Sequence, residues 1–328
     1  MHPLLSRAAR TQRRRPPFEC ERRHPGLEVR RPWRRVLLGW ILLVLACACA
    51  ATNYPEASGP LYTGRHGESR SLRSGADSPG SAPAPLEPTS AQDVAPPAAA
   101  PLRVVTFNIA FALQIDSALA VLRQAAPLRR PDFLALQEMD APSVERIAAT
   151  LGMNYIYYPS GLHPRYGRDF GCAVLSPWPL EEPRKIVMPQ RARFTGLTRV
   201  ITVATLRRGA QRFRVYAVHL PSPMGISKSA RHEQLEALLA DALASPDPVI
   251  LAGDFNSEAA GETFARSGFV WPTRDLVPTT RFLGVGFRYD HVLARGLRLA
   301  AGDSTVGVVE ENRAASDHCP VWALLVRE

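Results

Sequence analysis

Polar residues that can bind a metal ion or a phosphate group accompany several short apolar runs beyond residue 100. The runs VVTF, FLALQ and VYAV lead directly into Asn108, Glu138 and His219. The remaining members of this set follow VILAG, follow RFLGVGFRY or precede the last apolar run; they are Asp254, Asn256, Asp290, Asp317 and His318. Because strand ends hold side chains rigidly, these residues would form a site if their strands share one edge.

The residue types in this set suit phosphate chemistry at a metal ion. Glu138, Asp317 and Asn108 offer the oxygen ligands that a hard cation prefers. The other members supply hydrogen-bond donors and a proton acceptor around a phosphate, and they are His219, Asp254, Asn256 and His318. Any one of these residues alone would fit a turn, a cap or a buried histidine. Their repetition within one stretch of chain is what indicates a site.

The elements that must position these residues form one α/β domain over residues 102–328. We expect strands at 104–107, 133–136, 173–175, 198–206, 213–218, 249–252, 290–293 and 321–326. We expect helices at 117–126, 143–151 and 230–243. So many strands with so few helices favour two sheets packed face to face with helices outside. A doubly wound parallel sheet would need a glycine-rich first turn, which Asn108–Ala110 lacks.

At this point the motifs resemble those of the endonuclease/exonuclease/phosphatase superfamily, which includes exonuclease III, deoxyribonuclease I and the neutral sphingomyelinases. The motifs are TFN at 106–108, LQE at 136–138, VHL at 218–220, GDFN at 253–256, RYDHVL at 288–293 and SDHCPV at 316–321. The resemblance implies a deoxyribonuclease I-like four-layer α/β sandwich. It also implies cleavage of a phosphoester that depends on Mg²⁺, for which Mn²⁺ can substitute.

The same resemblance implies a role for each site residue. Glu138 resembles the principal metal carboxylate, assisted by Asn108 and Asp317. Asp254 resembles the residue that orients or deprotonates the attacking water. The resemblance makes Asn256 and His219 donors to phosphate oxygens, His318 the imidazole that stabilises the pentacovalent phosphorane, and Asp290 the carboxylate that orients it. A carboxylate beside His318 raises the pKa of that imidazole and keeps it cationic near neutral pH.

The sequence departs from the exonuclease III pattern in two places. Ala110 stands where such members often carry an acid, and no clear equivalent of their active-site tyrosine is present. We expect basic residues to contact the phosphate or the substrate instead, and the candidates are Arg165, Arg168, Arg191, Arg193 and Lys228. Cys172 and Cys319 lie in apolar runs, so we expect free thiols in the core rather than a disulfide.

The net charge of +10 at first suggests a nucleic-acid binder, but its distribution along the 328 residues does not. Residues 1–35 hold 11 arginines and three glutamates, a net charge of +8. Residues 102–328 hold 26 basic and 22 acidic residues, a net charge of only +4. The excess therefore belongs to an N-terminal basic arm rather than to the catalytic domain.

An uncharged segment at residues 36–52 follows Arg34 and Arg35 and suggests export. Its length lies between a signal-peptide core and a spanning helix. Cys47 and Cys49 stand near its end, so lipidation as in bacterial lipoproteins is one interpretation, and an uncleaved signal anchor or a cleaved export signal are the others. Residues 53–101 are rich in Pro, Ala and Ser and predict a disordered linker to a membrane surface.

The leading functional hypothesis is an exported, membrane-tethered phosphodiesterase or phosphatase that is active as a monomer. The modest charge of residues 102–328 favours a lipid headgroup or a small phosphoester over a nucleic acid. The main alternative is an extracellular nuclease that cleaves DNA or RNA. A second alternative is an inactive binding module of the same fold.

Overall fold

The computed structural model describes three stretches of the chain, residues 51–66, 100–312 and 314–328. Among these residues, none of the helices combines the length and the apolar character needed to cross a bilayer. Several predictions lie outside the described residues: the basic arm at 1–35, the segment up to residue 50 with Cys47 and Cys49, and the linker over 67–99.

The larger sheet has the strand order β1–β4–β5–β3–β2–β15–β13, and β14 also pairs with β15. Its strands are β1 (Tyr62–Gly64), β2 (Leu102–Asn108), β3 (Phe133–Met139), β4 (Asn154–Leu162), β5 (Asp169–Ser176), β13 (Leu297–Leu299), β14 (Val306–Val308) and β15 (Val321–Arg327). Only β2 and β3 run parallel, and this pairing brings Asn108 and Glu138 out at the same edge.

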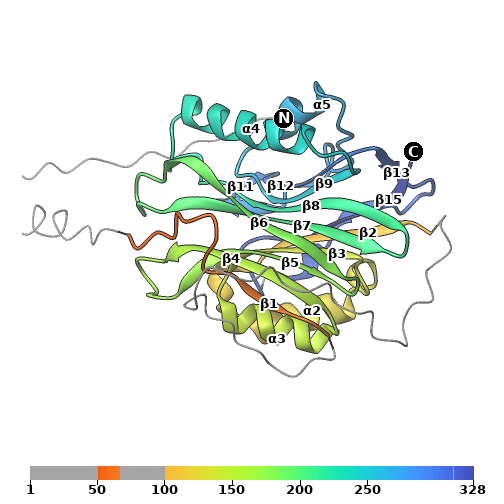
Figure 1. The fold of residues 1–328 in the computed structure, drawn as a ribbon, viewed down its shortest axis with the longest axis horizontal. Helices are drawn as coiled ribbons and strands as arrows, with labels where there is room; N and C mark the ends of the chain where they lie inside the picture. The colour runs from red at the N-terminus through yellow and green to blue at the C-terminus, as the bar shows by residue number, and fades with distance from the viewer. Residues whose placement is uncertain (1–50, 67–99, 313) are drawn as a thin grey trace, which may run out of the picture. The chain divides into compact units, whose positions relative to one another are not determined.

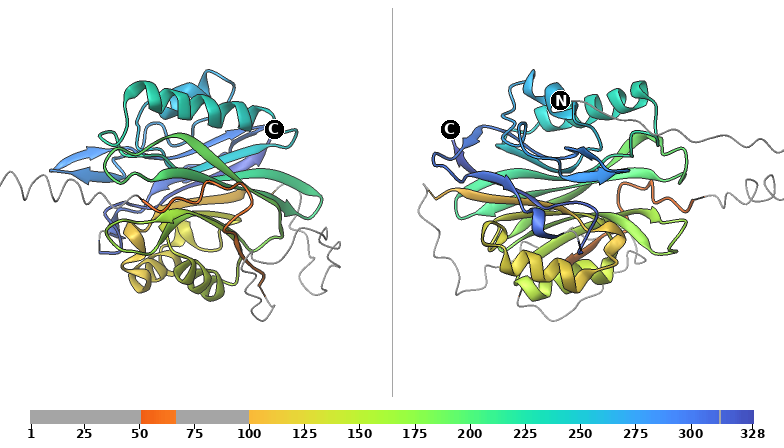
Figure 2. Two further views of the ribbon diagram at one scale, coloured as in Figure 1. Left: turned by 60° about the vertical axis from the view of Figure 1, so that its left-hand side comes forward. Right: turned by 180° about the vertical axis from the view of Figure 1, so that it is seen from behind.

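The smaller sheet has the order β12–β9–β8–β7–β6. Its strands are β6 (Leu180–Arg191), β7 (Thr198–Arg208), β8 (Gln211–His219), β9 (Val249–Asp254) and β12 (Asp290–Arg295). Here β8 and β9 are the parallel pair, with His219 opposite Asp254. A separate hairpin of β10 (Thr280–Phe282) and β11 (Val285–Phe287) precedes β12 and projects beyond the sandwich in the left view of Figure 2.

The helices cover the outer faces of the two sheets (Figure 1). They are α2 (Ile115–Gln124), α3 (Ala141–Leu151), α4 (Lys228–Leu243) and α5 (Ala260–Ala265), with short 3-10 turns η1 (Ala110–Ala112), η2 (Ala126–Leu128) and η3 (Glu310–Asn312). Local sequence sets their ends. The Asp140 carboxylate accepts a hydrogen bond from the Ser143 N–H at the start of α3, and Gly152 ends that helix with φ 66°.

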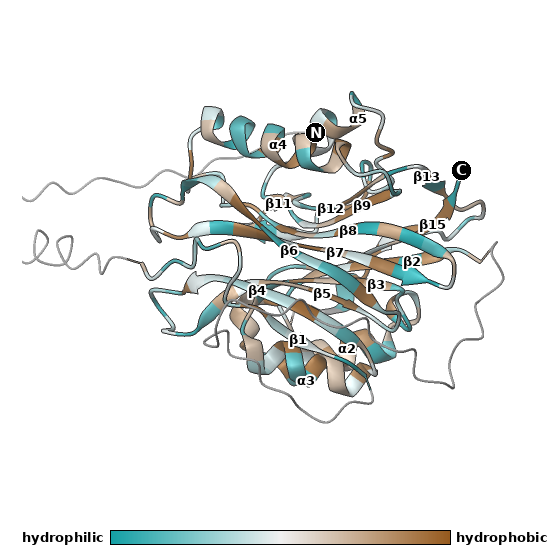
Figure 3. Cartoon of the chain, in the orientation of Figure 1, coloured by the Kyte–Doolittle hydropathy of each residue, from teal (hydrophilic) through white to brown (hydrophobic). Residues whose placement is uncertain are grey.

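Three apolar clusters hold these layers together. The central cluster joins the inner faces of the sheets, with Val104 and Phe133 from the larger and Val215 and Ile250 from the smaller. The two outer clusters pack α2 and α3 on the larger sheet and α4 and α5 on the smaller one. Figure 3 shows the long hydrophobic stretches of the strands between helices of mixed character. The predicted four-layer α/β sandwich is confirmed.

Residues 51–66 lie against this sandwich, which corrects the first part of the predicted linker at 53–101. We call residues 51–66 the strap. Its strand β1 pairs with β4, and its tyrosines Tyr54 and Tyr62 each donate a hydrogen bond of 3.3 Å to the Asp169 carboxylate. The buried Lys185 ammonium donates to the carbonyls of Tyr54 and Gly59. The strap is ordered because it satisfies buried polar groups, which composition does not reveal.

All eight predicted strands and all three predicted helices are present. The sequence did not indicate the long strands β4 and β6, nor the short elements β1, β10, β11, β13, β14 and α5. Pro159 in β4 lies at a register shift of the sheet. Pro183 and Pro189 fall in β6, which is an edge strand of its sheet. Proline is tolerated at such positions although it lowers the strand signal. Cys172 and Cys319 are both buried thiols, as their apolar neighbours predicted.

Candidate active site

The sandwich brings the ends of its central strands together at one edge. Asn108 and Glu138 end their strands on one sheet, and His219 and Asp254 end theirs on the other. Asp290 begins β12 directly opposite Asp254. We call this the catalytic edge: it is where β2, β3, β8 and β9 end and where β12 and β15 begin. The sequence set therefore assembles through strand direction rather than through nearness in the chain.

Asn108 bridges the two sheets at this edge. Its buried amide nitrogen donates to Asp254 Oδ2 at 3.1 Å and lies 3.4 Å from Glu138 Oε1. Its side-chain oxygen Oδ1 accepts a hydrogen bond from the Ala110 N–H at 3.1 Å. One amide thus fixes a carboxylate from each sheet, so Asn108 positions both of them.

The backbone is strained where it presents Glu138. This residue has φ 60°, in a region that non-glycine residues seldom adopt, and the pairing of β3 with β5 shifts register between Leu136 and Met139. The η1 turn, which follows β2, also has left-handed backbone, with Phe111 at φ 59°. The Phe111 N–H donates to Glu138 Oε2 at 3.1 Å, so the unusual turn supplies a donor to the carboxylate. Strain of this kind concentrates at functional sites.

Glu138, Asp317 and Asn108 fit a divalent cation by their chemistry. Burial raises the pKa of Glu138, the nearby Asp317 carboxylate raises it further, and the positive charges of Arg199 and His318 lower it. Two nearby carboxylates that repel each other supply oxygen donors for a hard cation. The Asn108 side-chain oxygen accepts from the Ala110 N–H in this structure, so Asn108 would have to turn its amide to become a third ligand. A bound cation there would neutralise charge and polarise a phosphoryl oxygen as a Lewis acid.

A second group of metal-binding types is present at the same edge. Ligand atoms of Asp254, Asp290 and His318 lie within 4.8 Å of one another. His318 Nδ1 lies 2.8 Å from Asp290 Oδ2, which also accepts a hydrogen bond of 2.6 Å from the Thr279 hydroxyl. Because these atoms already bind one another, we assign the group to proton handling rather than to metal binding.

The charge state of His318 follows from the two carboxylates beside it. Burial lowers the pKa of this imidazole, but Asp290 and Asp254 outweigh that effect and raise the pKa to about 10. His318 is therefore a cation at neutral pH. Its Nε2 lies 3.8 Å from Asp254 Oδ2, which places the positive charge within the catalytic cluster.

Asp254 is a buried carboxylate at the centre of the cluster. Burial raises its pKa to about 7, Asp290 raises it as well, and His318 opposes the shift. The backbone N–H of Asn256 donates to Oδ1 at 2.8 Å, and the Asn256 side-chain amide donates to Oδ2 at 3.0 Å. A carboxylate with a pKa near neutrality, held in this way, suits a proton acceptor for water.

The structure requires the particular residue types at Gly253 and Asn256 in the GDFN segment. Asn256 has φ 50°, a conformation that Asn tolerates better than most residues, and its amide also donates to the Leu220 carbonyl at 2.9 Å. A Cβ on Gly253 would lie 2.0 Å from the Val218 carbonyl oxygen, so only glycine fits between β8 and β9. Both amide donors of Asn256 are thus committed to internal partners, and in this structure Asn256 positions Asp254.

His219 is neutral in the folded protein. Burial lowers its pKa well below the usual value, and the positive charges of Arg199 and His318 lower it further. Its Nε2 lies 3.7 Å from Glu138 Oε1 and 3.6 Å from Asp254 Oδ2. A neutral imidazole between two carboxylates can donate one hydrogen bond to a phosphate oxygen without adding charge.

Of the five basic residues expected to contact substrate, Arg168 has a different role. Its guanidinium pairs with the buried Asp140 carboxylate at 2.9 Å and donates to the Phe111 carbonyl at 2.8 Å. It ties the 160–170 loop to the η1 turn, a positioning role that the sequence did not indicate. The side chains of the other four are exposed and make no hydrogen bond or ion pair to the cluster in the described chain; they are Arg165, Arg191, Arg193 and Lys228.

Arg199 on β7 is the functional residue that the sequence reasoning missed. Its Nε and Nη1 atoms are buried and have no hydrogen-bond partner among the described residues. Burial lowers the pKa of this guanidinium, and the nearby charges of Glu138 and Asp254 raise it. The guanidinium also stacks 4.8 Å from the Phe170 ring centroid. Arg199 is the only charged residue between 194 and 206, a signal that could have identified it.

Aromatic side chains line one flank of the cluster. Phe170 lies 5.6 Å from the His219 ring, and Phe111 lies 5.8 Å from Phe170 by ring centroids. His163 and Tyr166 pack on Phe111 at 4.8 Å each. The 160–170 loop and the η1 turn therefore form one aromatic wall beside the catalytic residues.

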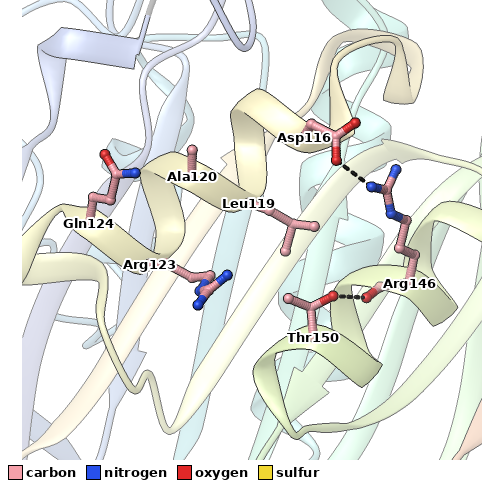
Figure 4. A pocket seen from close by; sticks show the side chains of 7 residues that line it. All are labelled: Asp116, Leu119, Ala120, Arg123, Gln124, Arg146 and Thr150. Atoms are coloured by element: carbon pink, nitrogen blue, oxygen red, sulfur yellow. Dashed lines mark hydrogen bonds and ion pairs between the residues drawn. The ribbon is translucent and has the colours of Figure 1, made fainter.

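A hollow elsewhere on the surface has no part in this cluster. It lies between α2 and α3, and Figure 4 shows its lining, with an ion pair between Arg146 and Asp116. Its remaining polar contact is local, because the Thr150 hydroxyl donates to the Arg146 carbonyl at 2.8 Å. The hollow contains none of the residues that the strand ends bring together.

Together, the residues of the catalytic edge can bind and hydrolyse a phosphoester. His318 and Arg199 bring positive charge to a site where a phosphate would otherwise meet the carboxylates of Glu138, Asp254, Asp290 and Asp317. Asp254 can accept the proton of a water molecule as the oxygen attacks phosphorus. Neutral His219 and cationic His318 can donate to the oxygens on which negative charge grows.

Comparisons with known proteins agree with this geometry. Residues 105–318 match the model of the Endonuclease/Exonuclease/phosphatase family. No curated protein matches the chain. A solved endonuclease/exonuclease/phosphatase from Beutenbergia cavernae is 23% identical with a TM-score of 0.55, over 70% of this chain and 72% of that one.

Two further structures share the fold at lower identity. D. rerio TDP2 complexed with single-strand DNA product is 17% identical, with a TM-score of 0.55 over 69% of this chain and 98% of that one. The human Nocturnin catalytic domain with bound sulfate is 19% identical, with a TM-score of 0.52 over 70% and 94%. The match over residues 105–318 covers most of the chain, and the chain belongs to the endonuclease/exonuclease/phosphatase family.

Proposed function

We propose that the chain is a divalent-metal-dependent phosphoester hydrolase that acts outside the cytoplasm, on a lipid headgroup or another small phosphoester. The observation that carries the proposal is the connected cluster at the catalytic edge. Asn108 joins Glu138 to Asp254 across the two sheets, and His318 joins Asp254 to Asp290. A family member that had lost catalysis would have no need to keep buried charges in so costly an arrangement.

The proposed reaction transfers the phosphoryl group to water. Asp254 accepts a proton from the water molecule while the oxygen of that water forms a bond to phosphorus. His318 and Arg199 stabilise the charge that develops on the phosphoryl oxygens, and the ester oxygen leaves with the phosphorus–oxygen bond electrons. Glu138, Asp317 and Asn108 would hold the cation that this chemistry requires.

The charge of the catalytic domain supports a small or lipid substrate. Residues 102–328 carry a net charge of only +4, whereas a protein that grips many phosphates uses an excess of Lys and Arg. One structural neighbour, D. rerio TDP2, is complexed with a single-strand DNA product. Cleavage of nucleic acid is therefore the alternative that an experiment must distinguish from cleavage of a lipid or small phosphoester.

The test is a substrate panel on the full chain with and without added Mg²⁺. We expect hydrolysis of bis(p-nitrophenyl) phosphate and of at least one phospholipid, loss of both after EDTA, and recovery with Mg²⁺ or Mn²⁺. His318→Asn should abolish turnover, whereas His232→Asn, an exposed histidine on α4, should not. Activity that survives EDTA would refute the metal role. Cleavage of DNA or RNA alone would select the nuclease.

A further inference from the structure

Exposed large apolar side chains gather at the catalytic edge. Eight such side chains are exposed among the described residues, and seven of them lie on segments that leave this edge. The seven are Leu113, Phe194, Met224, Val277, Phe282, Leu283 and Val285. The eighth, Leu243, lies at the opposite edge, where its carbonyl accepts a hydrogen bond from Arg295 at the far end of β12. Single exposed apolar residues are common, but their confinement to one edge is not.

The apolar segments flank the catalytic cluster on two sides. The Arg193 N–H donates to the Gly225 carbonyl at 2.7 Å, which joins the loop of Phe194 to the loop of Met224 beside the end of β8. On the other side, Thr280 forms a bridge with His318, and the β10–β11 hairpin extends outward from there. We call the Phe194 loop and the hairpin the apolar tips.

The apolar tips are strongly exposed. Phe194 is 77% exposed and Leu283 is 88% exposed, whereas the core residues Val104 and Phe133 are fully buried. Exposure of a large apolar side chain to water is unfavourable relative to burial. The side chains therefore favour a partner that removes them from water.

The loops around the tips carry basic residues and no acidic ones. This holds for residues 109–115, 160–168, 191–197, 221–228 and 280–287, whose charged residues are Arg165, Arg168, Arg191, Arg193, Lys228 and Arg281. Acids do stand next to these ranges: Asp116 and Asp169 follow two of them, Asp275 is two residues from Val277, and Glu258 accepts a hydrogen bond from the Arg288 N–H at 3.1 Å just past the hairpin. Apolar tips ringed by cations match the boundary between acyl chains and anionic headgroups of a bilayer.

The chain before residue 51 joins the domain at this same edge. The Asn53 side chain accepts a hydrogen bond from the Thr198 N–H at 2.6 Å and donates to the Gly196 carbonyl at 3.1 Å. A Cβ on Gly196 would lie 3.3 Å from the Ala51 Cβ, so the start of the strap lies against the loop that carries Phe194. In Figure 1 the strap, in orange, begins between the β4–β5 and β6–β7 turns.

This exit point connects two unrelated parts of the sequence. Residues 36–52 contain no charged residue, and they lead directly into the strap. If that segment attaches the chain to a membrane, the attachment point and the apolar tips belong to one edge of the domain. A linker that left from the opposite edge would instead direct the tips away from the bilayer.

We propose that the catalytic edge is a membrane-docking face. Phe194, Phe282 and Leu283 enter the boundary between headgroups and acyl chains of an anionic bilayer. The exposed arginines of the neighbouring loops contact lipid phosphates, and they are Arg165, Arg191, Arg193 and Arg281. The catalytic cluster then opens onto the bilayer surface. Docking does not depend on catalysis; only the substrate, a phospholipid headgroup of that bilayer, rests on the proposed function.

The test uses the full chain reconstituted in vesicles that contain an anionic phospholipid and, in one arm, lipids with brominated acyl chains. Phe194→Trp and Leu283→Trp each add one tryptophan at a tip, and Leu243→Trp adds one at the opposite edge as the matched control. We expect bromine to quench most of the added emission of the tip variants and to leave the control unquenched. The proposal would be overturned if bromine quenched the added tryptophan emission of the tip variants no more than that of Leu243→Trp.

A second arm separates docking from catalysis. The double variant Phe194→Ser/Leu283→Ser should lose about tenfold in hydrolysis of phospholipid in vesicles and keep its rate on a soluble short-chain ester of the same headgroup. Equal loss on both substrates would overturn docking. Quenched tips with no hydrolysis of any phospholipid would leave docking in place and refute the proposed substrate.

A third measurement addresses a second copy of the chain as the occupant. Sedimentation of the wild type in detergent should give a monomer. The membrane proposal would be overturned by two results together: a wild-type dimer that dissociates in the Phe282→Ser/Leu283→Ser variant, and tips that stay unquenched in vesicles. These results would show that the apolar tips join two copies of the chain.

Discussion

The catalytic edge has two regions that are built in opposite ways. We call the buried catalytic cluster the floor and the surrounding loops with exposed apolar side chains the rim. On the floor, polar residues such as Asn108 and Asp254 are buried and bonded to one another. On the rim, large apolar residues such as Phe194 and Leu283 are exposed. The floor reverses the usual placement of polar groups, and the rim reverses that of apolar ones. Chemistry requires a low-dielectric site with fixed charges, whereas docking requires apolar surface that water can leave.

The largest effect should come from Glu138 on the floor. Glu138→Gln keeps the size of the side chain but removes the charge that a cation requires, so kcat on bis(p-nitrophenyl) phosphate should fall on the order of 10²–10³-fold. Circular dichroism should show an intact fold. Glu258→Gln, an exposed glutamate, serves as the control. A Glu138→Gln enzyme with the wild-type rate would remove this residue from the mechanism.

Asp290→Asn should change both the rate and its dependence on pH. His318 stays protonated until the pH rises through about 10, because Asp290 and Asp254 outweigh the effect of burial on its pKa. Removing the charge of Asp290 lowers the pKa of His318, so the alkaline limb of the pH–rate profile should move to lower pH, with a rate loss of about 100-fold. An unchanged alkaline limb would contradict the assignment, and exposed Asp275→Asn is the control.

Arg199 and Arg193 test where the floor ends and the rim begins. The Arg199 guanidinium has two buried nitrogens without a hydrogen-bond partner among the described residues. Arg199→Lys substitutes an ammonium group, which is a point charge, so kcat/KM on a soluble phosphoester should fall about 10- to 100-fold. Arg193→Lys, on the exposed loop, should leave that value unchanged. The reverse result would restore the sequence-based expectation that Arg193 contacts the phosphate.

Asn53 should affect stability more than turnover. Asn53→Ala removes the hydrogen bonds to Thr198 and Gly196 and leaves an N–H and a carbonyl without a partner, so the free energy of unfolding should fall by about 1–3 kcal/mol. Urea denaturation of this variant against Ser58→Ala, an exposed residue of the strap, measures the difference. Equal stabilities would mean that the strap contributes nothing at this point.

The smallest effect should come from the rim. Phe282→Ser and Leu283→Ser remove exposed side chains, so the free energy of unfolding should change by no more than about 0.5 kcal/mol. Turnover of a soluble substrate should equal that of the wild type. A large loss of stability would show that the hairpin packs on the domain and would blur the distinction between floor and rim.

The floor could be predicted from the sequence because its residues follow apolar runs that form strands. Glu138 and His219 were identified from that pattern, and the structure brings them within 3.7 Å. Arg199 escaped because it lies inside a strand rather than at its end. The ion pair of Arg168 could not be predicted because its partner, Asp140, is 28 residues away in the chain and lies beside it only after folding.

The alternation of strands and helices, the residue types of the catalytic cluster and the place of the charge excess in residues 1–35 follow from the sequence alone. These are local properties, fixed by periodicity and by the residues that end each run. Folding settles which basic residue faces the cluster, that residues 51–66 pack on the domain, and that all but one of the exposed large apolar residues share one edge. Those facts depend on how strands from distant parts of the chain pair, and no local pattern encodes that pairing.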